Sequence, residues 1–191
     1  MAKKLESTLI NMILSLVLIS MVMSATLAFV YSKTKEPIEN AARQKEVDAI
    51  RQVLPEFDSD PVSGKTEKNG LVIYGVTRQN QTVGYAIKTF TDKGFGGHVD
   101  IMAGFLPDGS IYKVAVLAHK ETPGLGTKMT EPKFSDQFLG KNPADFILKV
   151  KKDGGRVDAI TAATISSRAY CDALERAYDT LKQINDSIAV K

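Results

Sequence analysis

The stretch HVDIMAGFLPDGSIYKVAVLAH, residues 98–119, contains two mainly apolar runs on either side of the tripeptide PDG. Residues 98–106 and 110–119 are rich in valine, isoleucine and aromatic residues, which are favoured in strands. Proline, aspartate and glycine are favoured in turns, because each suits a backbone conformation that a turn requires. The stretch therefore predicts an antiparallel hairpin around which the domain is organised.

Two further hairpins are predicted on either side of this one. The runs LVIYGVTR (71–78) and TVGYAIKTF (82–90) are separated by three polar residues. The runs FILKV (146–150) and RVDAI (156–160) are joined by KKDGG, which is another hairpin signal. Residues 57–69 are rich in turn formers and are expected to form a loop.

Two segments after residue 130 have apolar residues at helical spacing. A short helix is expected over 131–139, with Phe134 and Phe138 on one face. A final helix is expected over 166–185, where one apolar stripe contains Ala169, Tyr170, Ala173, Leu174, Ala177, Tyr178, Leu181 and Ile184. The predicted fold class is α+β, with antiparallel strands and helices packed on them.

The N-terminal region has a different character. Residues 9–30 contain no charged side chain, and a helix of this length rises about 33 Å, enough to cross a bilayer core of about 30 Å. A signal peptide is the competing interpretation, but its apolar region is normally only about 7–15 residues long. A transmembrane anchor is therefore favoured. The lysines and arginines on its two sides leave the orientation open.

The chain is thus expected to have four parts. Residues 1–8 form a short tail and residues 9–31 the anchor. Residues 32–56 form either a helical stalk or the first packed helix, because their helical pattern ends at Pro55. Residues 57–191 form the α+β domain.

Composition excludes several function classes. The net charge of +3 is small, and basic residues are not interleaved with aromatic ones, so no nucleic-acid footprint is seen. The single cysteine, Cys171, and two widely separated histidines do not match a metal-ligand spacing. Cys171 is expected to be a buried small apolar side chain. Any redox activity would need an organic cofactor or a partner protein.

The segment DAITAATISSRAY, residues 158–170, carries four aliphatic hydroxyls close together before a helical pattern. One hydroxyl can be explained as a helix cap, because its oxygen accepts a hydrogen bond from a free helix N–H. Capping does not explain all four. The alternative is that the helix start binds phosphate, to which its free N–H groups and dipole are suited. Ala162 and Ala163 would allow a bulky ligand to approach the backbone.

Two glycine-rich links are also present. KGFGG (93–97) lies between two predicted strands and is longer than a tight hairpin needs, and ETPGLG (121–126) leaves a strand. Neither matches a phosphate-loop or dinucleotide fingerprint. Each can be explained as a loop that uses glycine for positive φ.

Together these motifs resemble the FMN-binding domain of the G subunit of the Rnf electron-transport complex, which is related to the C subunit of the sodium-translocating NADH:quinone reductase. Asp158, Thr161, Ala163, Ser166 and Ser167 match the flavinylation motif around the acceptor threonine, which is Thr164 here. Ala162 stands where that motif usually has glycine. GFGGHVDIMAGF (94–105) and HKETPGLGTK (119–128) resemble two further motifs of the family, in the same order.

The resemblance implies a single-pass protein of the cell membrane with its C-terminal domain outside the cytoplasm. It implies an electron-relay subunit that couples electron transfer, with ferredoxin and NAD as the expected couple, to ion translocation by other membrane subunits. FMN would be joined to Thr164 by a separate flavin transferase that recognises Asp158. The other implied FMN neighbours are Thr161, Ala163, Ser166 and Ser167 near the phosphate, Glu121, Thr122, Gly124, Leu125 and Gly126 along the ring, and Gly96 and Gly97 opposite.

Other residues near these motifs are given weaker roles. His119 precedes the ring loop, but a lone histidine is more often structural. Lys128 follows the loop and is not assigned a role. Two alternatives stay open: the anchored flavin domain of a different redox or regulatory system, and an anchored adaptor without cofactor, in which the hydroxyls only cap a helix.

Overall fold

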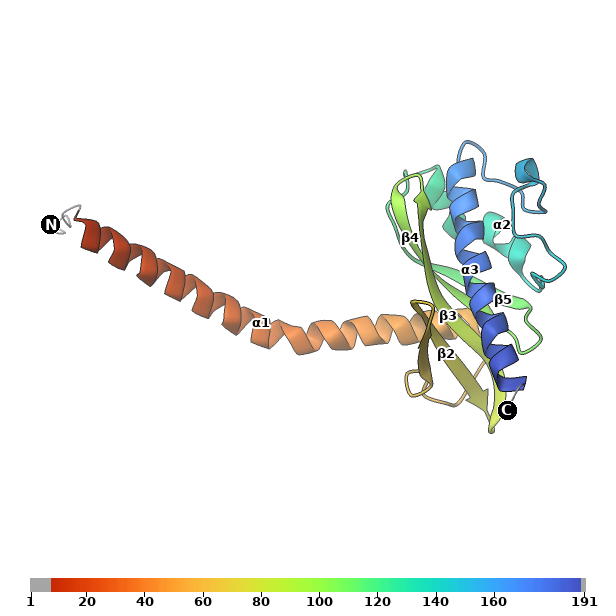
Figure 1. Ribbon diagram of the computed structural model, residues 1–191, viewed down its shortest axis with the longest axis horizontal. Helices are drawn as coiled ribbons and strands as arrows, with labels where there is room; N and C mark the ends of the chain where they lie inside the picture. Colours follow the sequence, from red (N-terminus) through yellow and green to blue (C-terminus); the bar gives the residue numbers. More distant parts are fainter. Residues whose placement is uncertain (1–7, 190–191) are drawn as a thin grey trace. The chain divides into compact units, whose positions relative to one another are not determined.

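The computed structural model describes residues 8–189, and the side chains as far as residue 185. The chain divides into two compact units, one ending at Lys45 and the other starting at Glu46 (Figure 1). Helix α1 (Leu9–Val53) supplies the first unit and the beginning of the second. It continues through Pro37, so the two expected helical stretches form one helix, which ends just before Pro55 as expected.

The first unit is a helix whose apolar side chains are exposed. Its most apolar window has a mean hydropathy of 2.4 and is 0% buried, so α1 is long and apolar enough to span a membrane. Two of its hydroxyls bond within the helix: Ser15 donates to the carbonyl of Met12 at 2.9 Å and Thr26 to that of Val22 at 2.8 Å. These bonds reduce the cost of placing the hydroxyls in an apolar medium.

The second unit is built on a five-stranded antiparallel sheet in which every strand pairs with its neighbours in the sequence. The expected hairpins 71–90 and 98–119 are confirmed. The first strand was not expected, because its residues KTEK are polar and show no apolar alternation. The strands are β1 (Lys65–Lys68), β2 (Leu71–Arg78), β3 (Gln81–Gly94), β4 (Gly97–Phe105) and β5 (Ile111–His119).

The two faces of the sheet bury separate cores. Helix α3 (Thr164–Ala189) lies along one face (Figure 1), and the expected stripe from Ala169 to Leu181 is buried there. The last turns of α1 pack on the other face, where Ile50, Val53 and Leu54 contact a cluster that includes Tyr74. The α+β class predicted from the sequence is confirmed.

Two expectations for the segment between β5 and α3 are wrong in detail. Residues 146–160 do not form a hairpin: they contain the short helix η3 (Lys151–Asp153) and one isolated parallel bridge between Val150 and Val157. The apolar alternation arises because Leu148, Val150 and Val157 fill the α3 core from a loop. The expected helix over 131–139 is split into α2 (Pro132–Ser135) and η2 (Asp136–Phe138), preceded by η1 (Gly126–Thr130).

The aromatic pair in this segment is placed as expected. Phe134 and Phe138 are both buried, and both contact the ring of Tyr170 on α3, with 5.2 Å between ring centroids in each case. This aromatic cluster fixes the segment between η1 and η2 against the first turns of α3. It thereby holds the ETPGLG loop close to the hydroxyl-rich start of the helix.

Candidate functional site

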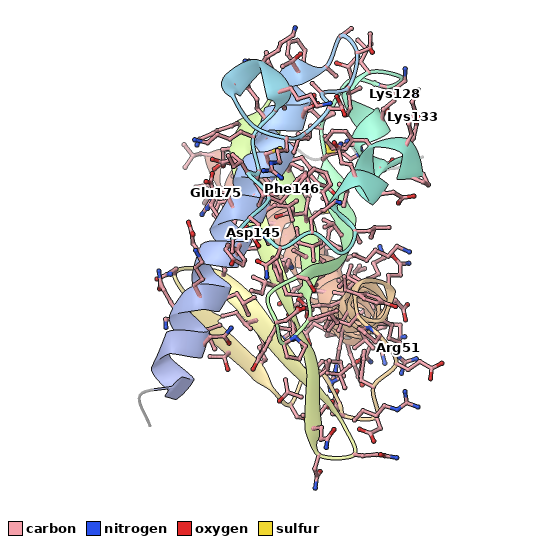
Figure 2. All side chains as sticks on the ribbon, turned by 90° about the vertical axis from the view of Figure 1, so that its right-hand side faces the viewer. Arg51, Lys128, Lys133, Asp145, Phe146 and Glu175 are labelled. Atoms are coloured by element: carbon pink, nitrogen blue, oxygen red, sulfur yellow. The ribbon has the colours of Figure 1, made fainter. Side chains whose placement is uncertain are left out.

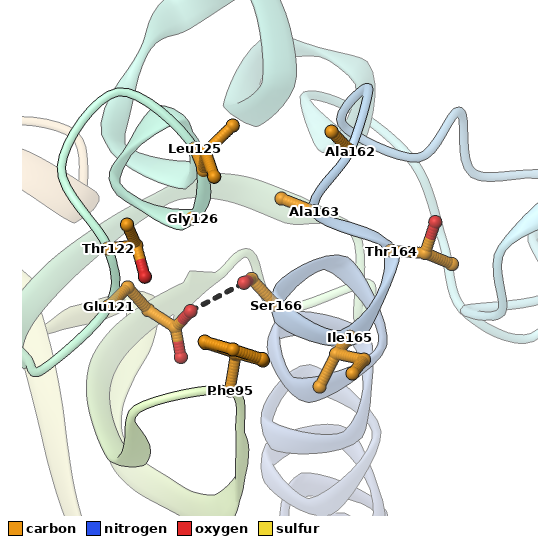
Figure 3. A pocket seen from close by; sticks show the side chains of 10 residues that line it. All are labelled: Phe95, Glu121, Thr122, Leu125, Gly126, Ala162, Ala163, Thr164, Ile165 and Ser166. Atoms are coloured by element: carbon orange, nitrogen blue, oxygen red, sulfur yellow. Dashed lines mark hydrogen bonds between the residues drawn. The ribbon is translucent and has the colours of Figure 1, made fainter.

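A pocket of about 310 Å³ lies where three segments meet: the β3–β4 turn, the loop from β5 to η1, and the first turn of α3 (Figure 3). The KGFGG link is a two-residue turn at Phe95 and Gly96, since Gly94 pairs with Gly97 in the sheet, so the longer loop expected there is wrong. The pocket is lined by Phe95, Glu121, Thr122, Leu125, Gly126, Ala162, Ala163, Thr164, Ile165 and Ser166.

The pocket has apolar walls at its mouth. Phe95, Leu125 and Ile165 are 68%, 40% and 46% exposed, which is unusual for large apolar side chains grouped at one place. Figure 3 shows them on three different segments around the same opening. Ligand pockets are typically apolar with a few placed polar groups, and the volume here is at the lower end of their usual range of about 300–1,000 Å³.

A buried hydrogen-bond network lies behind these walls. The Glu121 carboxylate is only 5% exposed. One of its oxygens accepts from the Ser166 hydroxyl at 2.5 Å, and the other from the backbone N–H of Gly96 at 3.1 Å. Glu121 itself is held by its backbone N–H, which donates to Nδ1 of His119 at 3.3 Å. Through this bond His119 contacts the start of the loop.

The start of α3 offers free donors to the pocket. Ile160 and Ala163 close a turn through a 3.0 Å backbone hydrogen bond, and Ala162 within it has φ of 61°. The N–H of Ser167 donates to the carbonyl of Ala163 at 3.1 Å and begins the helical pattern. The N–H groups of residues 164–166 precede any helical carbonyl that could accept from them. With the helix dipole, they form a site suited to an anion.

The four hydroxyls of the motif have different positions. Thr164 is half-buried and lines the pocket. The Ser166 hydroxyl donates a hydrogen bond to the Glu121 carboxylate. Ser167 is fully buried outside the pocket lining, where it accepts from the N–H of Ile160 at 2.9 Å and donates to the carbonyl of Ala163 at 3.0 Å. Thr161 is exposed and lines a second pocket. Neither serine acts as a simple N-cap of α3. In these hydrogen bonds, neither hydroxyl oxygen accepts from an N–H group of the first turn of the helix.

The second pocket, of about 210 Å³, has Lys128, Lys133, Asp158 and Thr161 among its lining residues. Lys128 and Lys133 lie close together in Figure 2. Asp158 is exposed and forms an ion pair with Lys151 at 2.7 Å, while its backbone N–H donates to the Gln137 side chain at 2.8 Å. Asp158, the first residue of the motif, is therefore on the surface and does not line the first pocket.

The structure brings together most of the residues singled out in the sequence. Glu121, Thr122, Leu125, Gly126, Ala163, Thr164 and Ser166 line one pocket. Gly96 donates its backbone N–H to the Glu121 carboxylate. Gly97 and Gly124 do not line the pocket and adopt positive φ. Thr161, Ser167 and Asp158 lie outside the lining. Sequence reasoning missed Phe95 and Ile165, although an aromatic residue inside a glycine-rich turn was a usable signal.

Cys171 lies on α3 in the core, as expected. Burial, followed by the nearby negative charges of Glu175 and Asp153, raises the pKa of its thiol to about 12. The thiol is thus kept protonated and unreactive at neutral pH.

Comparison with known proteins identifies a matching family model and several relatives. The model of the FMN-binding domain matches residues 94–179, which include every residue of the first pocket. The chain is 38% identical to the G subunit of the ion-translocating oxidoreductase complex of Methanosarcina acetivorans, over 88% of this chain and 92% of the relative. Identity to the protein of the same name is 33% for Aliivibrio fischeri, with 86% of each chain covered. It is 31% for Pasteurella multocida, with 89% and 92% covered.

A solved structure shares the fold. The C subunit of the Na⁺-translocating NADH-quinone reductase from Parabacteroides distasonis superimposes with a TM-score of 0.52, over 78% of this chain and 92% of that chain. The sequences are 21% identical, so this likeness concerns the architecture alone.

Proposed function

Because this chain belongs to the family of G subunits of ion-translocating oxidoreductase complexes, we propose that it is the electron-carrying member of such a complex and holds one FMN covalently on Thr164. It is a component of an oxidoreductase, and it does not form a complete enzyme alone. FMN supplies the reversible uptake of electrons that the side chains of this protein lack.

The observation that carries the proposal is the position of Thr164. Thr164 is the first residue of α3 and lines the pocket, so its hydroxyl oxygen is carried by the turn that has three free N–H donors, and in Figure 3 the side chain points away from Ser166. A phosphate ester at this oxygen would place its negative charge at the positive end of the helix dipole. The exposed side chains of Phe95, Leu125 and Ile165 provide the apolar surface that a flavin ring needs. The residues present therefore fit FMN.

We propose that attachment needs a flavin transferase with FAD as the donor. The Thr164 oxygen forms a bond to the phosphorus of the FMN half, the pyrophosphate P–O bond breaks, and AMP leaves. The hydroxyl proton passes to a base of the transferase. Among the described residues, no side chain of the pocket is hydrogen-bonded to the Thr164 hydroxyl, so none is placed to act as its base. Exposed Asp158, at the start of the motif and outside the first pocket, is suited to recognition by that enzyme.

We further propose that α1 anchors the domain on the outer side of the cell membrane. Residues 9–30 carry no charged side chain, so this helix provides no path for an ion, and translocation belongs to partner subunits. The proposed couple is ferredoxin and NAD, between which this flavin relays electrons. A covalent tether has a physical advantage outside the cell, where a dissociated cofactor would be lost by dilution.

Threonine substitutions test the proposal. We expect the full chain from its native membrane to carry the mass of one FMN less water and to fluoresce in a denaturing gel. Thr164→Ala should abolish both signals, whereas Thr164→Ser should retain them because the hydroxyl remains. Thr66→Ala is the matched control, since it removes an exposed threonine outside the motif and outside both pockets and should leave the flavin attached.

Two outcomes would contradict the proposal. One is covalent flavin that persists in Thr164→Ala. The other is an unmodified wild-type mass from cells that contain a flavin transferase, which would favour a cofactor-free adaptor.

A further inference from the structure

The first pocket contains a buried carboxylate that forms no direct ion pair with a cation among the described residues. Glu121 is 5% exposed, although residues 122–125 that follow it are exposed. It takes no part in the salt bridges found within the described part of the chain. Burial of a carboxylate is costly unless its oxygens accept hydrogen bonds. Here the bonds come from Gly96 and Ser166.

These two bonds connect all three segments that form the pocket. Gly96 is in the β3–β4 turn, Ser166 is in the first turn of α3, and Glu121 itself is in the loop before η1. The Ser166 bond joins residues 45 positions apart, and the Gly96 bond joins residues 25 positions apart. Figure 3 shows Glu121 and Ser166 pointing toward each other among the residues that line the pocket.

The glycines beside this carboxylate leave the space it occupies. A Cβ on Gly126 would collide with one oxygen of Glu121 and would lie 2.6 Å from the Ser166 hydroxyl oxygen. A Cβ on Gly94 would lie 2.5 Å from the other carboxylate oxygen. Both glycine-rich links of the sequence therefore contain a glycine that gives room to the Glu121 side chain.

We propose that Glu121 is a positioning residue that joins the three pocket segments and, as a buried anion in the pocket wall, lowers the reduction potential of the bound flavin. The inference rests on the proposed function. Each electron that reaches the ring without a proton adds negative charge there. Coulomb repulsion from a nearby carboxylate, in a site with little water, makes that step less favourable.

Glu121→Gln tests the charge apart from the hydrogen bonds, because it removes the negative charge and keeps groups that can form both bonds. The glutamine carbonyl can accept from Gly96, and its amide can donate to the Ser166 hydroxyl, which serves as donor or acceptor. We expect the full chain in detergent, loaded with flavin by co-expression with a flavin transferase, to keep its unfolding temperature. In a spectroscopic redox titration its midpoint potential should rise by about 30 mV or more, which is tenfold in the two-electron equilibrium constant.

Two further variants complete the test. Glu131→Gln removes a negative charge from an exposed side chain outside this pocket, so its potential should match wild type. Glu121→Asp keeps the charge but is one methylene too short to hold both bonds, so its unfolding temperature should fall while its potential stays low.

Three results would overturn the inference. They are an unchanged potential in Glu121→Gln, a shift no larger than that of Glu131→Gln, and a Glu121→Gln chain that does not fold. Loss of flavin from the wild-type chain is a different result, because it contradicts the proposed function and is read from the protein mass before any titration.

Discussion

Ala162 adopts a backbone conformation that alanine seldom takes. Its φ of 61° lies in the left-handed region, where the Cβ of an L-residue approaches the following carbonyl. The matching position of the flavinylation motif usually has glycine, which has no Cβ and adopts this conformation without strain. This chain thus has the same turn geometry before α3, and the backbone of Ala162 is strained in it.

Replacing Ala162 with glycine should therefore stabilise the domain. Relief of left-handed strain contributes roughly 1–2 kcal/mol, and the greater freedom of glycine in the unfolded chain offsets up to about 1 kcal/mol. We expect a net gain of about 0.5–1 kcal/mol, measured as a higher unfolding temperature. Ala163→Gly is the neighbouring control: Ala163 is buried and is outside the positive-φ set, so this change should destabilise. A lower unfolding temperature for Ala162→Gly would contradict the strain argument.

Single-residue roles in the motif could be predicted only in part. The sequence identifies four hydroxyls near a helix start, but which of them enters the pocket depends on where the helix begins. Helix α3 begins at Thr164, two residues earlier than expected, and this places Ser166 toward Glu121 and Ser167 toward the 160–163 loop. The partner of Ser166 lies 45 residues away in the chain, so no local pattern could have revealed it.

At the scale of elements, the β3–β4 hairpin carries a charged cluster on its surface. Nδ1 of His98 lies 2.6 Å from a carboxylate oxygen of Asp92, and Nε2 lies 3.1 Å from one of Asp100. The His98 ring is stacked on Phe90, with 5.4 Å between centroids. The hydrogen bond to Asp92, with a further contribution from the charge of Asp100, raises the pKa of His98 above its ordinary value of 6.5.

This raised pKa predicts the sign of a pH effect. A histidine whose pKa is higher in the folded state stabilises the fold below its unfolded pKa, and the stabilisation is lost as pH rises through the folded value. We expect the His98 imidazole, followed by NMR, to titrate above 6.5, and Asp92→Asn to lower its pKa. The unfolding temperature of wild type should fall more than that of His98→Gln between about pH 5.5 and about pH 8.5. Equal falls in the two chains would rule the cluster out as a source of stability.

The elements that sequence predicted well are those with a periodic apolar pattern and a recognisable turn. β2 to β5 and α3 are of this kind. β1 was missed because the pattern of KTEK is polar, although Asn69 and Gly70 after it, with φ of 55° and 73°, form a turn typical of a hairpin. The false hairpin at 146–160 shows the converse: Leu148, Val150 and Val157 are buried from a loop, and an apolar alternation does not distinguish this from a strand.

At the scale of the whole molecule, the domain needs the end of α1. Ile50, Val53 and Leu54 are buried against a face of the sheet where Tyr74, Val76 and Met102 are fully inaccessible. Burial of three large aliphatic side chains contributes roughly 5 kcal/mol or more, which is comparable with the stability of a typical domain.

A pair of truncations tests this requirement and the expected domain boundary at residue 57. We predict that a chain starting at Glu46 is soluble, monomeric and cooperatively folded, because it retains both cores. A chain starting at Phe57 should expose the second core and aggregate or unfold at a much lower temperature. Gel filtration and circular dichroism distinguish the two, and equal stability of both fragments would show that the α1 contacts contribute little.

The strand order of the sheet also affects when, during folding, the proposed flavin site is completed. Each strand pairs only with its sequence neighbours, whereas α3 reaches β3 through contacts such as Thr89 to Ala173, which join residues 84 positions apart. Contacts of long sequence separation close large loops and form late in folding. We therefore expect the sheet to form first and Thr164, the proposed acceptor, to reach its final surroundings last. A modifying enzyme that recognises the finished loop would then load the cofactor only onto chains that have completed their folding.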